Sequence, residues 1–143
     1  MDKAECILQF VNYSVDEIVF INNSEFDKEE TELKLKFKHN IKEDDKEAKK
    51  YYVNIAMNVY DKDEHEMKDC PFQLNVSMTG VFKISNYEGI DDDVINKIVG
   101  ENTIAILFPY LRSLITSITA NANINPLILP PVNIISLLEN EKK

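Results

Sequence analysis

The side chains that could do chemistry gather in one acidic stretch, residues 61–69. Its carboxylates belong to Asp61, Asp63, Glu64, Glu66 and Asp69. Carboxylate oxygens are the ligands that Ca²⁺ prefers, but a calcium-binding loop also needs a glycine at its sharp turn, and this stretch has none. We therefore interpret the stretch as a solvated loop between two strands and not as a metal site.

The sequence carries no motif typical of an enzyme. Its glycines, Gly80, Gly89 and Gly100, do not form a glycine-rich phosphate loop, and neither CxxC nor HExxH occurs. His39 and His65 lie at the ends of charged connectors, where we expect solvated surface side chains. These observations predict a protein that is not an enzyme and that uses no cofactor or metal.

The net charge limits the partners of this protein. The chain has 25 acidic and 16 basic side chains, which give a formal charge of -9 at pH 7. A surface of this sign repels phosphate backbones and anionic lipid headgroups, and so argues against binding to nucleic acid or to a membrane. Proteins with a basic or neutral surface suit it better as partners.

Cysteine content and hydropathy indicate the compartment. Cys6 and Cys70 are the two cysteines, and the first residues show no apolar run of the kind found in signal peptides. We therefore expect a cytoplasmic protein with reduced thiols. The longest apolar stretch, residues 104–118, is interrupted by Pro109 and Arg112, so we expect no membrane insertion. A length of 143 residues suits one domain that spans the whole chain.

Alternation of apolar and polar residues predicts four strands. They are expected at residues 5–22, 31–39, 51–61 and 72–85. The first is expected to be long or broken in its middle. The second places Leu33, Leu35 and Phe37 on one face and three lysines on the other. Because the connections are short, the strands should form an antiparallel sheet.

The C-terminal third predicts helices. One or two turns at residues 94–99 should end at Gly100, and a longer helix should follow from residue 103. Residues 131–138 can form a short last helix. Strands that precede helices in this way predict an α+β fold, a four-stranded antiparallel sheet with two C-terminal helices packed on one face.

Large apolar side chains exceed what such a sheet needs. Leu127, Ile128 and Leu129 stand in a loop between prolines, where they either close the core or form the wall of a hydrophobic groove. In the second interpretation the last helix completes the wall, and the sheet side of the groove is lined by Leu33, Leu35 and Phe37. Such a groove would hold extended apolar segments of another chain.

The long helix has a second apolar feature. Its helical-spacing stripe consists of Leu107, Leu111, Leu114 and Ile118. This stripe is core in a monomer and interface in an oligomer, and we expect the helix to serve both purposes.

Two motifs resemble the SecB family of bacterial export chaperones. ILFPYLRSLITSI, which starts at Ile106, resembles the ILFPYAR helix of the family, and LPPVNIISLL at residues 129–138 is similar to its LAPVNFxxL segment. Weaker similarity extends to ELKLKFK at residues 32–38 and to GVFKISNYEG at residues 80–89.

The resemblance implies a cytoplasmic, ATP-independent holdase. Members of the family assemble as a dimer of dimers whose long helices pack between the pairs. They bind unfolded polypeptides or preproteins in hydrophobic grooves and keep them competent for export. Carried over by position, this groove would use Leu33, Leu35 and Phe37 together with Ile134 and Leu138.

The same resemblance implies a hand-off of clients to the SecA motor through an acidic patch on the exposed sheet face. Glu17 stands at one matching acidic position. Gln73 and Asn75 stand where the family carries leucine and glutamate, and the acidic C-terminal tail of typical members is missing after Lys143. Two other roles therefore remain open: a solitary SecB-like chaperone that protects the antitoxin of a toxin-antitoxin system, and an adaptor for one folded partner.

Overall fold

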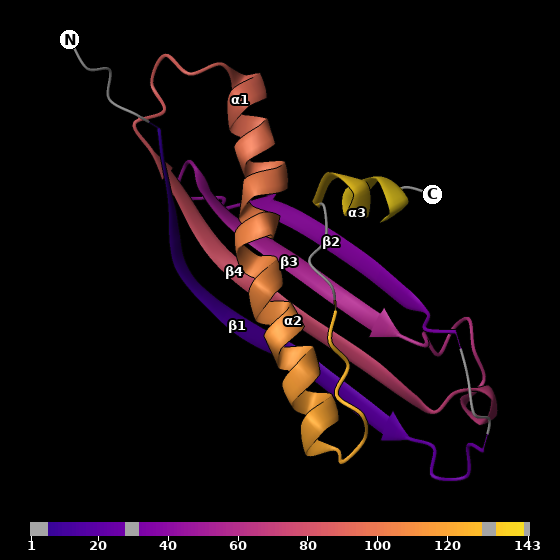
Figure 1. Ribbon diagram of the computed structural model, residues 1–143. Helices are drawn as coiled ribbons and strands as arrows, with labels where there is room; N and C mark the ends of the chain where they lie inside the picture. Colours follow the sequence, from indigo (N-terminus) through magenta and orange to yellow (C-terminus); the bar gives the residue numbers. More distant parts are fainter. Residues whose placement is uncertain (1–5, 28–31, 130–133, 142–143) are drawn as a thin grey trace.

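Four strands form one antiparallel sheet in the computed structural model, which describes residues 6–27, 32–129 and 134–141 (Figure 1). The strands are β1 (Ile7–Asn22), β2 (Leu35–Glu43), β3 (Lys50–Val59) and β4 (Phe72–Ser85). Their order across the sheet is β1-β4-β3-β2, so β1 and β2 are the two edges. The predicted fold class is confirmed: the helices follow the strands in sequence and lie on one face of this sheet.

β1 is long and irregular, as the sequence predicts. It spans 16 residues and pairs with β4 from Ile7 to Asn22, with register shifts between Phe10 and Asn12 and between Val15 and Glu17. Each shift adds an unpaired residue and bends the strand, as a β-bulge does.

β2 differs from its predicted range. The strand begins at Leu35 and continues to Glu43, beyond its expected end at residue 39. The start expected at Thr31 lies outside the described residues. Continued pairing explains the extension, because Ile41 lies opposite Val53 and Glu43 opposite Tyr51. Main-chain pairing with β3 therefore sets the end of the strand, where side-chain alternation no longer marks it.

The first helices form one continuous rod. α1 (Asp92–Lys97), η2 (Ile98–Asn102) and α2 (Thr103–Asn121) together span 30 residues. The predicted stop at Gly100 is wrong, because a turn of π-helix carries the chain through it. By length and composition the rod is apolar enough to cross a membrane. Its inner side chains are instead buried against the sheet, as in a core helix.

The core lies between α2 and the sheet. From the helix, Leu107, Leu111 and Ile115 are fully buried, and from the sheet, Val76 and Phe82 are fully buried too. The last helix, α3 (Ile134–Glu141), lies beside β2. A short 3-10 turn, η1 (Met67–Asp69), precedes β4. On the face opposite the helices, the described strands carry exposed or half-buried side chains.

Candidate functional site

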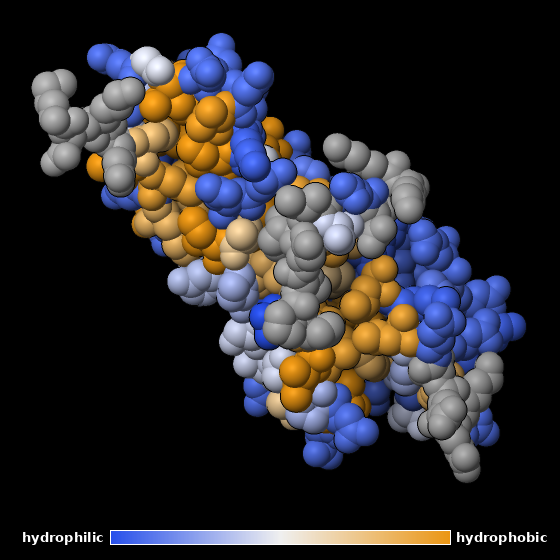
Figure 2. All heavy atoms as spheres, turned by 45° about the horizontal axis from the view of Figure 1, so that its top comes forward, coloured by the Kyte–Doolittle hydropathy of each residue, from blue (hydrophilic) through white to orange (hydrophobic). Residues whose placement is uncertain are grey.

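An apolar row emerges from the core along β2. Phe37 is 6% exposed and packs edge-on against Phe108 of α2, with ring centroids 5.9 Å apart. Leu35, which points to the same face, is 41% exposed, and Leu33 is 42% exposed. The row therefore begins under α2 and ends as open apolar surface. Figure 2 shows apolar side chains gathered in patches on the helix-bearing side, with hydrophilic residues around them.

The segment after α2 is held to the helix by threonine hydroxyls. The Thr116 hydroxyl donates to the carbonyl of Leu127 at 2.8 Å, and the Leu127 N–H donates to Oγ1 of Thr119 at 2.8 Å. These bonds satisfy the main chain of an extended segment that has no strand partner. They also orient its side chains, because Leu129 is 2% exposed whereas Ile128 is 73% exposed.

The structure divides the predicted groove residues into three groups. Phe37 and Leu129 are buried in the core of the single chain, and their contact with a client stays a prediction that requires this part of the core to open. Leu33 and Leu35 are exposed, and Leu127 and Leu138 are partly buried at the margin of the core. Ile134 begins α3, and its side chain lies outside the described residues.

The predicted interface stripe is divided in the same way. Leu107 and Leu111 are fully buried on the sheet side of α2, so in the single chain they belong to the core, and a role at a subunit interface stays a prediction. Leu114 and Ile118 are partly buried against that core. The outward face of the helix instead exposes Ile106 and Tyr110.

β1 adds apolar surface that the sequence analysis missed. Its large exposed side chains are Ile7, Val11, Tyr13, Val15, Ile18, Val19 and Ile21. Tyr13 lies against Tyr110 of α2, with ring centroids 4.9 Å apart. The signal was present in the run from Ile18 to Ile21, where apolar residues occupy both faces of an edge strand instead of one.

α3 contacts β2 through the carboxylate of Glu141, which lies against both the main-chain N–H and the ring of His39. The His39 N–H donates to Oε1 of Glu141 at 2.9 Å, and Nδ1 of His39 contacts Oε2 of the same carboxylate. The side chains are 26% and 19% exposed. The expectation of a solvated His39 is therefore wrong, because a residue 102 positions further along the chain covers it.

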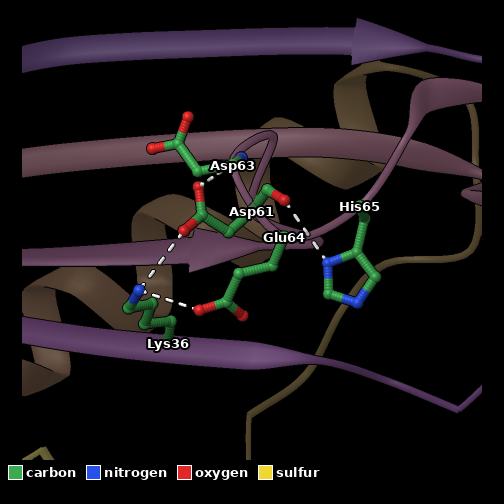
Figure 3. A network of polar contacts seen from close by, with 5 residues as sticks. All are labelled: Lys36, Asp61, Asp63, Glu64 and His65. Carbon is green, nitrogen blue, oxygen red and sulfur yellow. Dashed lines mark hydrogen bonds and ion pairs between the residues drawn. The ribbon is translucent and has the colours of Figure 1, made fainter.

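The acidic stretch after β3 forms an internal network (Figure 3). Nζ of Lys36 lies 2.9 Å from Oε1 of Glu64 and 3.5 Å from Oδ2 of Asp61, and the Asp61 side chain is only 8% exposed. The hydrogen bond and charge of Glu64 are the main cause that raises the pKa of Lys36, and Asp61 adds to it. Nδ1 of His65 lies 3.3 Å from the carbonyl of Asp61.

This network corrects the prediction of a solvated loop at Asp61. The carboxylate is buried because Lys36 of β2 reaches across to it. Its role is to tie the loop to the edge strand. Over the described residues, no group of three or more potential ligands is placed to hold a metal ion.

The uncovered sheet face has a shallow hollow of about 430 Å³. Glu17, Asn58, Gln73 and Asn75 are among the side chains that line it. Nδ2 of Asn75 donates to Oε1 of Glu17 at 2.8 Å, so the structure brings together the two positions compared with the acidic patch of the family. The amide of Asn75 occupies the position at which the family carries a glutamate, so this face carries one negative charge fewer.

Comparison with known proteins identifies relatives over most of the chain. The model of a family described as preprotein translocase subunit SecB matches residues 13–143. An uncharacterized protein of Methanocaldococcus jannaschii, MJ0357, is 36% identical over 137 residues, which cover 95% of this chain and 85% of that protein. The protein-export protein SecB of Magnetococcus marinus is 28% identical over 114 residues, or 80% of this chain and 69% of that protein.

A solved structure shares the fold. The SecB-like chaperone Rv1957 of Mycobacterium tuberculosis, in complex with a ChAD peptide from the HigA1 antitoxin, superposes with a TM-score of 0.68. The match covers 88% of this chain and 90% of that chain at 15% sequence identity.

Proposed function

This chain belongs to the SecB family, and from that premise we propose that it is an ATP-independent holdase that binds unfolded or preprotein chains. The family consists of chaperones and not of enzymes. The observation that carries the proposal is exposed apolar surface: Leu33 and Leu35 around the start of β2, and Ile128 in the loop after α2, are all more than 40% exposed. Surface of this kind on a chain of net charge -9 is typical of a site that another polypeptide covers.

Binding would draw on apolar burial and not on a fixed client sequence. Each Å² of apolar surface that leaves water contributes about 25 cal/mol, whatever side chain supplies it. Leu127 and Leu138, which are partly buried beside the core, would extend the contact. A client long enough to reach several subunits would bind more tightly, because each later contact is intramolecular.

Assembly into a homo-oligomer, a dimer of dimers, is part of the proposal. The outward face of α2 exposes Ile106 and Tyr110, and the edge strand β1 exposes apolar side chains on both of its faces. An edge strand also has unpaired main-chain groups that a second copy can pair. Packing of the long helices between subunits would cover these residues without involving Leu107 or Leu111.

Two hand-offs are compatible with this chemistry. In export, the loaded chaperone meets SecA through the uncovered sheet face, where Glu17 is the candidate contact and Asn75 replaces a carboxylate. In the alternative, the client is an antitoxin, as in the M. tuberculosis complex that shares this fold. An adaptor for one folded partner is the third reading. Each places the protein in the cytoplasm, without nucleotide.

Light scattering tests the proposal. A chemically unfolded protein is diluted into buffer with increasing amounts of this protein and no nucleotide. We expect aggregation to fall and the effect to saturate near one assembly per client. Unchanged aggregation across the titration would refute a general holdase and leave the dedicated adaptor. If aggregation is suppressed, pull-down with SecA or with an antitoxin separates the two hand-offs.

A further inference from the structure

The outer edge of β2 has a defined set of main-chain groups. The N–H of Tyr60 donates to the carbonyl oxygen of Lys34 at 2.9 Å, and the N–H of Asp44 donates to the carbonyl oxygen of Lys50 at 2.7 Å. The even-numbered residues of this strand therefore form the main-chain hydrogen bonds with β3. Since antiparallel pairing alternates, the odd-numbered residues direct their N–H and C=O groups away from β3. These residues are Leu35, Phe37, His39, Ile41 and Glu43.

One of these outward donors is already occupied. Within the described part of the chain, the N–H of His39 donates to Oε1 of Glu141 at 2.9 Å. In an added antiparallel strand, a main-chain carbonyl oxygen would accept this same bond. The carboxylate of α3 therefore imitates the acceptor of an incoming strand, and its second oxygen contacts the His39 ring.

α3 also supplies apolar side chains beside β2, as a bound peptide would. Leu137 and Leu138 pack as partly buried side chains against the core, next to the strand whose inner face carries Phe37 and Leu35. α3 thus offers this edge an acceptor for a main-chain N–H and two apolar side chains. These are the two kinds of group that an extended apolar peptide offers.

We propose that α3 is an intramolecular competitor for the outer edge of β2, and that an extended polypeptide with alternating apolar side chains displaces it by pairing with that edge. The incoming main chain takes the N–H of His39 from Glu141 and pairs with Leu35 and Ile41. Its apolar side chains then lie over the helix-bearing face, where Leu35 is exposed. The competition deepens the proposed holdase function and rests on it, and it requires clients to bind in an extended conformation.

Amide hydrogen exchange tests, without any client, whether the contact between Glu141 and His39 holds α3 on β2; this contact is called the latch below. In Glu141→Ala, the N–H of His39 and the amides of α3 should exchange roughly tenfold faster, because a hydrogen bond to a charged acceptor is lost. Glu139→Ala is the matched control, since Glu139 is exposed on the same helix. Unchanged exchange at His39 in Glu141→Ala would overturn the latch.

Peptide binding tests the competition. The probe is a short fluorescent peptide of alternating valine and threonine. Glu141→Ala should bind it roughly tenfold more tightly than wild type or Glu139→Ala, because the internal competitor is weakened by about the strength of one such bond. In the bound wild type, the amides of Leu35 and Ile41 should gain protection, whereas the even-numbered amides, already paired with β3, should not.

The outcomes separate the two claims. Faster exchange in Glu141→Ala together with equal or weaker peptide binding would overturn the competition. Tighter binding with no added protection at Leu35 and Ile41 would overturn pairing at the edge. If no variant binds the peptide and none suppresses aggregation, the proposed function fails, while the exchange comparison still decides whether Glu141 holds α3.

Discussion

A Cβ atom added at Gly80 would stand 3.2 Å from both Cδ atoms of Leu107 and 2.8 Å from Cε2 of Phe82. α2 therefore lies so close to β4 that the strand has no room for a side chain at this position. A side chain at this position would push Leu107, and α2 with it, away from β4.

Gly80→Val should destabilise the fold by about 1–3 kcal/mol, because the added atoms force Phe82 and Leu107 out of their packed positions. Gly100→Ala, in η2, is the control, since nothing lies within 4 Å of an added Cβ there. It should leave stability unchanged or raise it by about 0.5–1 kcal/mol. Urea unfolding of both variants measures the difference. Equal stability of Gly80→Val and wild type would contradict the close approach.

Thr119→Val should cost about 1–3 kcal/mol, because the partly buried N–H of Leu127 loses its acceptor, the buried hydroxyl of Thr119. The isosteric change keeps the volume of the side chain and removes only its hydroxyl. Exchange of the Leu127 amide should rise together with the loss of stability. The exposed Ser117→Ala is the matched control on the same helix and should change stability by less than about 0.5 kcal/mol. Slow exchange at Leu127 in Thr119→Val would show that the hydroxyl does not hold the segment.

Lys36→Gln should remove a pH-dependent contribution to stability. Glu64 and Asp61 raise the pKa of Lys36 above its ordinary value of 10.5, so the folded protein holds this proton more firmly than the unfolded chain. The contribution is complete below pH 10.5 and disappears as the pH rises through the higher, folded-state pKa. Stability curves of wild type and variant should therefore converge in that alkaline range. Lys62→Gln, at an exposed lysine of the same loop, is the control, and parallel curves for Lys36→Gln would exclude the linkage.

Leu35→Asp should weaken the binding of unfolded protein by about tenfold without dissociating the assembly. The leucine is 41% exposed, so the new carboxylate stays hydrated in the free protein and is buried only under a client. The loss corresponds to about 1.5 kcal/mol, the lower end of the value for one buried leucine. Val94→Asp is the control, because Val94 is a similarly exposed apolar residue on α1, 48% accessible. Equal losses in both variants would indicate a charge effect and not a site.

Ile106→Asp should dissociate the proposed oligomer while the subunit remains folded. Ile106 is 37% exposed in the single chain, so a charge there is tolerated until another subunit covers it. An unpaired charge buried in an interface costs several kcal/mol. Sedimentation velocity measures assembly, and circular dichroism measures folding. An unchanged oligomer would move the interface away from this face of α2.

Periodicity in the sequence determined the fold class. Alternation at Leu33, Leu35 and Phe37 assigned the inner face of β2, and helical spacing at Leu107 and Leu111 assigned the inner face of α2, because each regular backbone repeats its side-chain direction. The motif from Ile106 to Arg112 carried the family. These are local properties, and a linear sequence displays them directly.

Only the tertiary structure decided which parts of those faces are covered. Phe37 and Leu35 share a face, yet one is core and the other is surface, because Phe37 packs against Phe108 of α2 whereas Leu35 stays 41% exposed. His39 pairs with Glu141 across 102 residues, and Lys36 reaches Asp61 from a neighbouring strand. Periodicity gives the direction of a side chain. Which helix or strand then packs against that side chain depends on how the whole chain folds. For that reason the burial of these residues and the contact of Glu141 with His39 could not be predicted from the sequence.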